Sequence, residues 1–328
     1  MTADAIILRN LRSAAEAGVS GADLARDLGI SRAAVWARIE DLRRAGYDIE
    51  ASPHRGYLLR GAPDALHADD LMSRCPSGRV IGRDIRVFSE TASTNDIVDR
   101  LAREGVAEGV VVFAERQTQG RGRLGRRWES PAGRGLWLSV LLRPPLRPVA
   151  AMQLTVMAAV ACARAVERQT ALRPQIKWPN DLMFGARKCG GILLEMAAEL
   201  DHVHHVVLGI GIDVNLTAPE LPANLRGMAT SLRMELGRAV DRSALAATLM
   251  GALDEAYRLV GTGGFGPLAD EWEERCTTLG QHVTIRVGST RISGTAESLD
   301  DDGALRVRTD HGRLERVVGG DVTVVVPE

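Results

Sequence analysis

The spacing of apolar residues changes twice along this 328-residue chain, and each change marks a different kind of fold. Through about residue 60, apolar side chains recur at helical spacing in short runs that glycine and serine separate. From about Leu66 to Cys276, strand-like apolar runs alternate with longer helical runs, as in a sheet backed by helices. The last part, about fifty residues, consists of short alternating runs between Gly and Asp turns, which is typical of a small β-barrel. The sequence therefore predicts an α+β protein built from three parts.

The first part has the pattern of a winged helix-turn-helix. We expect helices around residues 6–11, over 21–28 and over 32–44. Gly29 closes the second helix and the Ser31 hydroxyl can cap the third, which gives the tight turn between two helices that this motif requires. The run YDIEASPHRGYLLR then predicts two short strands joined by a turn at 53–56, which would form the wing.

DNA binding is expected of this part because of particular side chains rather than total charge. Nine basic residues against eight acidic ones through Arg60 would suit a three-helix packing module equally well. The polar residues predicted on the third helix and the wing tip are those that a major-groove reader with a flanking phosphate contact needs. These candidate DNA-binding residues are Ser31, Arg32, Arg38, His54 and Arg55.

The central part contains the segment ERQTQGRGRLGRRWESPAGRG, residues 115–135, which holds six arginines and five glycines between two predicted strands. Glycines let successive backbone N–H groups turn toward an anion while arginine side chains surround it. Trp128 offers a face on which an adenine ring could stack. A disordered RGG-like nucleic-acid segment or a solvated loop are the alternatives, and the flanking strands and lack of repetition argue against both.

Lysine use points to the same region. Of 41 basic side chains only two are lysine, Lys177 in QIKWPND and Lys188 in ARKCGGILLE. Lysine is a compact point charge that reaches a single phosphate or carboxylate oxygen, whereas arginine is a planar fork. Two lysines this close together suggest a site that requires the compact charge; chance survival in an arginine-biased composition is the alternative.

These segments resemble the motifs of biotin protein ligases. GRGRLGRRW is similar to the nucleotide-binding loop of that family. Four other segments occur in the order that the family shows: residues 92–95, KWPND, residues 188–192 and GIGIDVN at 209–215. The two terminal parts resemble those of the longer members, which also repress the biotin operon. The resemblance covers essentially the whole chain. It implies a winged helix-turn-helix at 1–62, a mixed-sheet α/β catalytic domain of the biotin/lipoate ligase type at 66–277, and a small SH3-like β-barrel at 278–328.

The resemblance implies a reaction in two halves. The carboxylate of biotin attacks the α-phosphate of ATP to give biotinyl-5′-AMP and pyrophosphate. A lysine of a biotin carboxyl carrier protein, the acetyl-CoA carboxylase subunit, then takes the biotinyl group. Positive groups and Mg²⁺ lower the barrier of the first half because two anions must meet. Bound biotinyl-AMP is expected to promote a homodimer that presents two winged helices to operator DNA.

The resemblance also implies roles for individual residues. Lys188, Arg123 and Lys177 are expected to be catalytic, with Arg123 retaining the adenylate. The expected biotin-binding residues are Ser93, Thr94, Asn95, Gln117, Arg121, Gly122, Arg123 and Lys188. The expected ATP- and adenylate-binding residues are Arg123, Arg126, Trp128, Lys177, Asn180, Asp181 and Asp213. Asp181 is the candidate Mg²⁺ ligand, with a plain turn residue as its alternative. Without the other motifs, Ser93-Thr94-Asn95 before a helix would be read as an N-cap.

Two features leave the site open to other readings. The family usually has Asn where this chain has Asp213, and an added carboxylate could recruit metal or repel phosphate. The glycines of GIGIDVN and of Gly190-Gly191 are expected to let strand backbones approach the ligand.

A lipoate or octanoate ligase, and a ligand-sensing transcription factor without catalysis, are the rival functions. The first would lack the paired STN and GRGR motifs, and the two lysines argue against the second.

Composition sets further limits. The net charge of −1 gives the whole molecule no strong attraction to nucleic acid or membrane, so binding to a polyanion must come from a local patch. Four scattered cysteines without a C-x-x-C pair favour reduced thiols, and the amino terminus shows no leader pattern. Residues 149–163 are apolar but too short and interrupted for a bilayer, and are expected to form a buried helix. We expect a cytoplasmic protein with no membrane partner.

Overall fold

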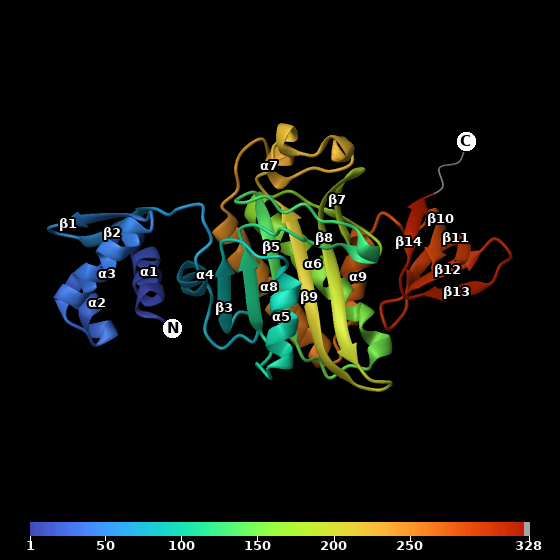
Figure 1. Cartoon of the computed structure of the whole chain (residues 1–328), viewed down its shortest axis with the longest axis horizontal. Helices are drawn as coiled ribbons and strands as arrows, with labels where there is room; N and C mark the ends of the chain where they lie inside the picture. The colour runs from blue at the N-terminus through green and yellow to red at the C-terminus, as the bar shows by residue number, and fades with distance from the viewer. Residues whose placement is uncertain (325–328) are drawn as a thin grey trace. The chain divides into compact units, whose positions relative to one another are not determined.

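The structure is a computed structural model that describes residues 1–324 as two compact units (Figure 1). One unit is Met1–Gly78 with Asp241–Ala247, and the other is Arg79–Val240 with the chain from Thr248 onward. The end of the predicted strand VTVVV, at 325 and 326, lies outside the described residues.

The first unit is the expected winged helix-turn-helix, followed by one further helix. Its elements are α1 (Ala3–Ala14), α2 (Gly21–Leu28), α3 (Arg32–Arg44), β1 (Asp48–Ser52), β2 (Gly56–Gly61) and α4 (Ala68–Arg74). Strands β1 and β2 pair antiparallel and form the wing. Helix α3 begins where predicted because the Ser31 hydroxyl accepts a hydrogen bond from the Ala34 N–H at 3.1 Å. Helix α2 ends where predicted because Gly29 adopts a left-handed conformation, with φ of 65°.

The inner faces of these helices form one apolar core. Val35, Ile39 and Leu42 of α3 are buried together with Leu8 and Leu24 of the two preceding helices. The helical spacing of these residues is what placed them on one face in the sequence. The outer face of α3 is therefore left to solvent.

The second unit is built on a seven-stranded mixed sheet with the strand order β3-β4-β5-β9-β8-β7-β6. The strands are β3 (Asp84–Phe88), β4 (Val110–Ala114), β5 (Gly135–Leu142), β6 (Gln175–Lys177), β7 (Asp181–Phe184), β8 (Arg187–Ala198) and β9 (Val203–Asp213). Only the β3–β4 pair is parallel among the pairings described in this sheet. The helices are α5 (Thr94–Arg103), α6 (Met152–Thr170), α7 (Leu232–Leu236), α8 (Arg242–Gly261), which begins in the first unit, and α9 (Gly266–Arg275).

Helices α5 and α6 pack against different parts of this sheet: α5 contacts β4, β5 and β9, and α6 contacts β7 and β8. The stretch Pro148–Thr170, which includes α6, is the one described helix long and apolar enough to cross a membrane. The sequence-based judgement that it is too short was therefore wrong. Most of the stretch is nevertheless buried inside the protein, as predicted for a core helix.

The C-terminal strands form a separate antiparallel sheet with the order β13-β12-β11-β10-β14. They are β10 (His282–Val287), β11 (Thr290–Leu299), β12 (Leu305–Thr309), β13 (Leu314–Val317) and β14 (Asp321–Val324). The Leu299 N–H donates to a Glu273 carboxylate oxygen at 2.7 Å, which ties β11 to α9. The prediction of several short antiparallel strands after residue 277 is confirmed.

Candidate active site

A cavity of ≈ 780 Å³ lies at the sheet, between strands β6 to β9, the start of α5 and the arginine-rich segment. Its volume falls within the range of small-molecule sites. Every central residue that the sequence assigned to biotin or ATP lines it: Ser93, Thr94, Asn95, Gln117, Arg121, Gly122, Arg123, Arg126, Trp128, Lys177, Asn180, Asp181, Lys188 and Asp213. Residues more than 100 positions apart in the chain thus share one wall.

Both lysines lie close to Asp181 in the strand order, and Lys188 forms an ion pair with it. Lys177 of β6 pairs with Asp181 of β7 in the strand register, and Asp181 leads into the β7–β8 hairpin that carries Lys188. The Lys188 ammonium lies 2.6 Å from Asp181 Oδ1 and 5.2 Å from the centre of the Trp128 ring. Asp181 therefore offsets part of the positive charge that Lys188 brings to the cavity wall.

The segment 120–128 folds back on itself through its own backbone. The Gly122 N–H donates to the Arg126 carbonyl at 2.7 Å, and Arg121 and Arg127 form a β-bridge. Leu124 lies between them in a left-handed conformation, with φ of 56°, and its side chain is exposed. The Arg123 guanidinium donates to Asn180 Oδ1 at 3.3 Å, which joins the segment to the turn before β7. We call residues 120–128 the arginine loop.

Trp128 packs on glycine backbone within the cavity wall. A Cβ on Gly211 would lie 2.7 Å from Trp128 Nε1, so only glycine leaves room for the indole there. Trp137 supports the ring from the side, with 6.3 Å between the ring centres and 70° between the planes. The indole N–H of Trp128 is buried and has no hydrogen-bond partner among the described residues. Stacking of adenine on this ring remains a prediction.

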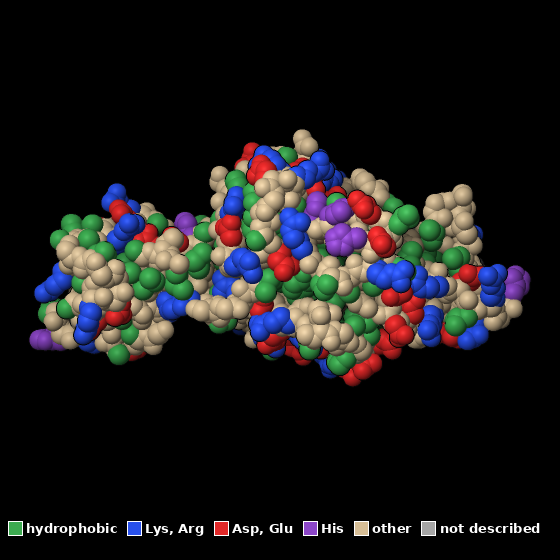
Figure 2. Space-filling model, turned by 90° about the horizontal axis from the view of Figure 1, so that it is seen from below, with side chains coloured by type: hydrophobic (Ala, Val, Ile, Leu, Met, Phe, Trp, Pro, Cys, Tyr) green, Lys and Arg blue, Asp and Glu red, His purple; other side chains and the backbone are tan. Residues whose placement is uncertain are grey.

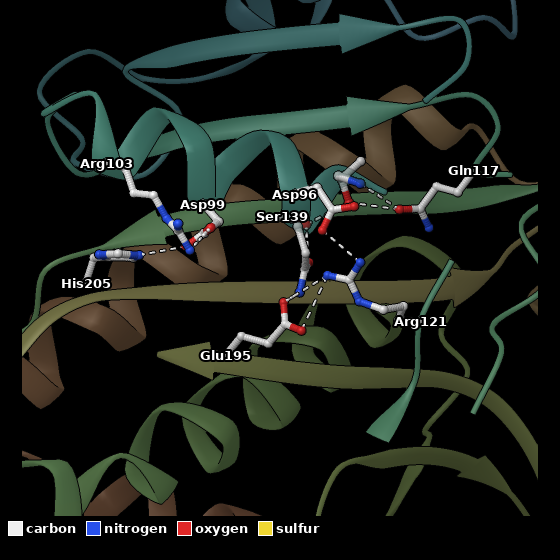
Figure 3. Close-up of polar contacts among 10 residues, drawn as sticks. Asp96, Asp99, Arg103, Gln117, Arg121, Ser139, Glu195 and His205 are labelled. Carbon is white, nitrogen blue, oxygen red and sulfur yellow. Dashed lines mark hydrogen bonds and ion pairs between the residues drawn. The ribbon is translucent and has the colours of Figure 1, made fainter. Parts of the chain in front are cut away.

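At the end of the cavity where Asn95 lies over Gly209, the lining includes neutral residues that hydrogen-bond to one another; Figure 3 labels Gln117 of this set. Ser93, Thr94 and Asn95 are all buried at the start of α5, and the Ser93 side chain makes no capping bond. Ser93 therefore occupies the N-cap position of α5 but does not cap the helix through its side chain. Thr94 donates through its backbone N–H to Gln117 Oε1 at 2.9 Å, and Gln117 Nε2 donates to Ser130 Oγ at 3.0 Å.

Glycine again makes room for a side chain at this end. A Cβ on Gly209 of β9 would lie 2.4 Å from Asn95 Oδ1. We expected the glycines of GIGIDVN to let the strand backbone approach the ligand directly. Gly209 and Gly211 both line the cavity, and the missing side chains also leave room for Asn95 and Trp128.

Comparison with known proteins agrees with this geometry. The model of the biotin/lipoate A/B protein ligase family matches residues 87–213, an HTH domain matches 6–58, and the biotin protein ligase C-terminal domain matches 278–325. The bifunctional ligase/repressor BirA of Bacillus subtilis is 35% identical over 304 residues, which cover 93% of this chain and 93% of that protein. This chain belongs to the biotin protein ligase family.

Other relatives of the family agree. BirA of Escherichia coli is 32% identical over 306 residues, 93% of this chain and 92% of that protein. The solved structure of biotin protein ligase from Aquifex aeolicus in complex with biotin and ATP is similar with a TM-score of 0.63 and 28% identity, covering 74% of this chain and 99% of that one. The chain is thus an enzyme of the ligase class that carries a repressor-type helix-turn-helix domain.

Three polar residues of this ligase site escaped the sequence reasoning. Ser139 of β5, Glu195 of β8 and Asp96 of α5 hydrogen-bond or ion-pair with the predicted residues Asn95 and Arg121, but stand behind the cavity wall. Ser139 and Glu195 each interrupt an apolar strand run, GLWLSVLL and GILLEMAA. A polar residue in such a run was the available signal.

Asp213, the departure from the family's usual Asn, is 7% exposed at the end of β9. Burial raises the pKa of its carboxyl well above the usual range, while the charge of Lys188 acts in the opposite direction. Burial likewise raises the pKa of the Cys189 thiol, which is buried and free of a disulfide. A carboxyl held neutral would resemble the amide that the family usually has there.

The candidate DNA-binding residues lie on the outer face of α3 and at the tip of the wing. Arg32, His54 and Arg55 are exposed, while Arg38 lies 3.5 Å from Asp4 of α1. Their role in DNA binding remains a prediction. A further side chain on this face, Trp36, is 58% exposed and was not predicted. Figure 2 shows basic and acidic side chains interspersed on the surface, in keeping with the net charge of −1.

Proposed function

We propose that the protein is an ATP-dependent ligase that activates biotin as biotinyl-5′-AMP and transfers it to a lysine of a biotin carboxyl carrier protein. The observation that carries this proposal is one cavity whose lining changes along β9. At one end Trp128 lies over Gly211 with Lys188 beside its ring, and at the other end Asn95 lies over Gly209 with the neutral side chains of Ser93, Thr94 and Gln117. Biotin has the same asymmetry, since it joins a carboxylate to a neutral ureido ring.

In this proposal the neutral end binds the ureido ring. Amide and hydroxyl groups that already hydrogen-bond to one another present donors and acceptors in set directions, so little ordering is needed when the ring binds. The carboxylate of biotin then reaches Lys188, whose ammonium exchanges Asp181 for the ligand anion. The adenylate lies under the arginine loop, where Arg123 retains it until the carrier arrives.

The phosphate end also suits magnesium. No group of three or more His, Cys, Asp or Glu side chains suited to a metal occurs among the described residues. Mg²⁺ is commonly held by one or two carboxylates together with substrate phosphates, and Asp181 offers one such carboxylate on the cavity wall. We therefore propose that Mg²⁺ enters with ATP and that Asp181 is its protein ligand. It would neutralise charge that develops on the phosphates.

A biotin adenylation assay tests the ligase proposal. Purified protein with biotin, ATP and Mg²⁺ should release pyrophosphate and form biotinyl-5′-AMP, and adding a carrier domain should yield a biotinylated lysine. Lipoate or octanoate in place of biotin should give no adenylate. Activity with those acids alone would favour the rival ligase, and no adenylate from any acid would favour a sensor without catalysis.

We further propose that the winged helix binds operator DNA and represses biotin synthesis genes when biotinyl-AMP promotes a homodimer. The HTH match and the bifunctional relatives support this role. The domain limits 1–62, 66–277 and 278–328 are part of the proposal. Sedimentation with and without biotin and ATP, combined with a salt-dependent gel shift on the gene's upstream region, tests it. A monomer under all conditions would refute the switch.

A further inference from the structure

A chain of hydrogen bonds and ion pairs starts at Arg121 of the arginine loop, passes through Glu195, Asn95 and Ser139, and reaches Gln117 (Figure 3). Arg121 ion-pairs with Asp96 Oδ1 at 2.7 Å and with Glu195 Oε2 at 3.3 Å. The same Glu195 Oε2 accepts a hydrogen bond from Asn95 Nδ2 at 2.7 Å. On the far side of Asn95, Ser139 Oγ donates to Asn95 Oδ1 at 2.5 Å.

The chain then reaches Gln117. Ser139 Oγ lies 2.7 Å from Thr94 Oγ1, and Thr94 Oγ1 lies 3.1 Å from Gln117 Oε1. Gln117 Nε2 donates to Ser130, two residues beyond the end of the arginine loop. One end of this hydrogen-bond chain therefore lies in the arginine loop, at Arg121, and the other lies just after it, at Ser130.

Glu195 stands where the two halves of the chain meet. A carboxylate only accepts hydrogen bonds, so it requires the NH₂ group of Asn95 to face it. That requirement turns the Asn95 oxygen toward Ser139 and fixes which way the amide points. The same carboxylate provides half of the negative charge that holds Arg121; the other half comes from Asp96 of α5.

We infer that Glu195 is a positioning residue that couples closure of the arginine loop to the orientation of the Asn95 amide in the biotin pocket. Glu195 is not among the residues that line the cavity, and it acts through Asn95 and Arg121. Asp96 contributes to loop closure alone, and Ser139 to amide orientation alone. The inference rests on the proposed ligase function, since it assigns the pocket at Asn95 to biotin.

Four nearly isosteric variants test this division of roles: Glu195→Gln, Asp96→Asn, Ser139→Ala and the control Asp99→Asn. Asp99 lies on the same helix as Asp96 but pairs with Arg103 and His205, away from the cavity (Figure 3). Loop closure is measured as the rate of tryptic cleavage within residues 121–127 in the presence of biotin and ATP. Mass spectrometry identifies the cleaved peptides. Orientation of the amide is measured as the Kd for biotin by calorimetry.

The variants should separate into a definite pattern. Asp96→Asn should speed cleavage of the loop about three- to tenfold without changing the biotin Kd, because exposed ion pairs are individually weak. Ser139→Ala should raise the Kd about three- to tenfold without changing cleavage. Glu195→Gln should change both measurements, and Asp99→Asn neither. A general loss of stability would not sort the variants in this way, and melting temperatures within about 2 °C of wild type check for it.

Two failures can be told apart. If wild-type protein forms no biotinyl-AMP, the proposed function fails and the inference falls with it. If the wild type is active but Glu195→Gln changes one measurement alone or neither, or if Asp99→Asn behaves like Asp96→Asn, the inference is wrong and the proposed function stands.

Discussion

Gly209→Ala should weaken biotin binding because the new methyl group would occupy space that Asn95 uses. The added Cβ would lie 2.4 Å from Asn95 Oδ1, about 1 Å closer than an ordinary van der Waals contact. The amide must move by about that distance, and its hydrogen bonds to Ser139 and Glu195 now measure 2.5 Å and 2.7 Å. Such a shift takes one or both beyond about 3.2 Å, the usual limit for a good hydrogen bond.

The expected cost follows from those two bonds. A neutral hydrogen bond contributes about 1 kcal/mol and one to a charged group about 1.5–3 kcal/mol, so losing both costs about 2.5–4 kcal/mol. If the misplaced amide loses a comparable interaction with the ureido ring, the Kd for biotin rises about 70- to 850-fold. Calorimetry measures this Kd, and urea denaturation measures the accompanying fall in the free energy of unfolding.

Gly251→Ala in α8 is the matched control. A Cβ at Gly251 meets nothing within 4 Å, so alanine there should stabilise the helix by about 0.5–1 kcal/mol and leave biotin affinity unchanged. A Gly209→Ala protein that binds biotin as tightly as the wild type would refute the reasoning. It would mean that Asn95 is not held where the ligand needs it.

Three further predictions concern other parts of the protein. Lys188→Arg should slow pyrophosphate release about 10²- to 10³-fold, because a planar fork cannot replace the compact ammonium beside Asp181; a rate near wild type would contradict this role. Asp213→Asn should raise the free energy of unfolding, and this gain should grow from about pH 4 upward. The raised pKa of Asp213 makes the folded state bind a proton that the unfolded state has released, so the wild-type protein loses stability as pH rises. Urea denaturation at pH 5 and pH 8 measures it, and an equal gain at both would count against it. Trp36→Ala should weaken operator binding in a gel shift about tenfold without lowering the melting temperature, since the ring is exposed and can meet a thymine methyl group; unchanged binding would exclude that contact.

The sequence predicted most where the signals are local. The predicted span of α3, 32–44, was correct at both ends. Its start is a local signal, because Ser31 lies beside the residues that it caps. The sequence also predicted strand-like apolar runs in the central part, and β4 is one such run, buried along its whole length. Neither prediction needs knowledge of what lies across the core.

Contacts between distant segments were not predictable in the same way. Asn95 and Glu195 are 100 residues apart, and their hydrogen bond depends on where α5 lies over the sheet. The family motifs identified Asn95, but gave no sign that Glu195 decides which way its amide points. Likewise the glycines of GIGIDVN were recognised as needing space, whereas the side chains that fill the space come from other elements.

The placement of Lys177 and Lys188 on one cavity wall has a practical consequence for chemical probing. Apart from the amino terminus of the chain, these two side chains are its only primary amines. An amine-specific acylating reagent therefore modifies almost no residue outside the cavity, and its reaction reports on Lys177 and Lys188. Protection of the two positions from labelling would follow ligand occupancy directly, residue by residue, without an engineered probe.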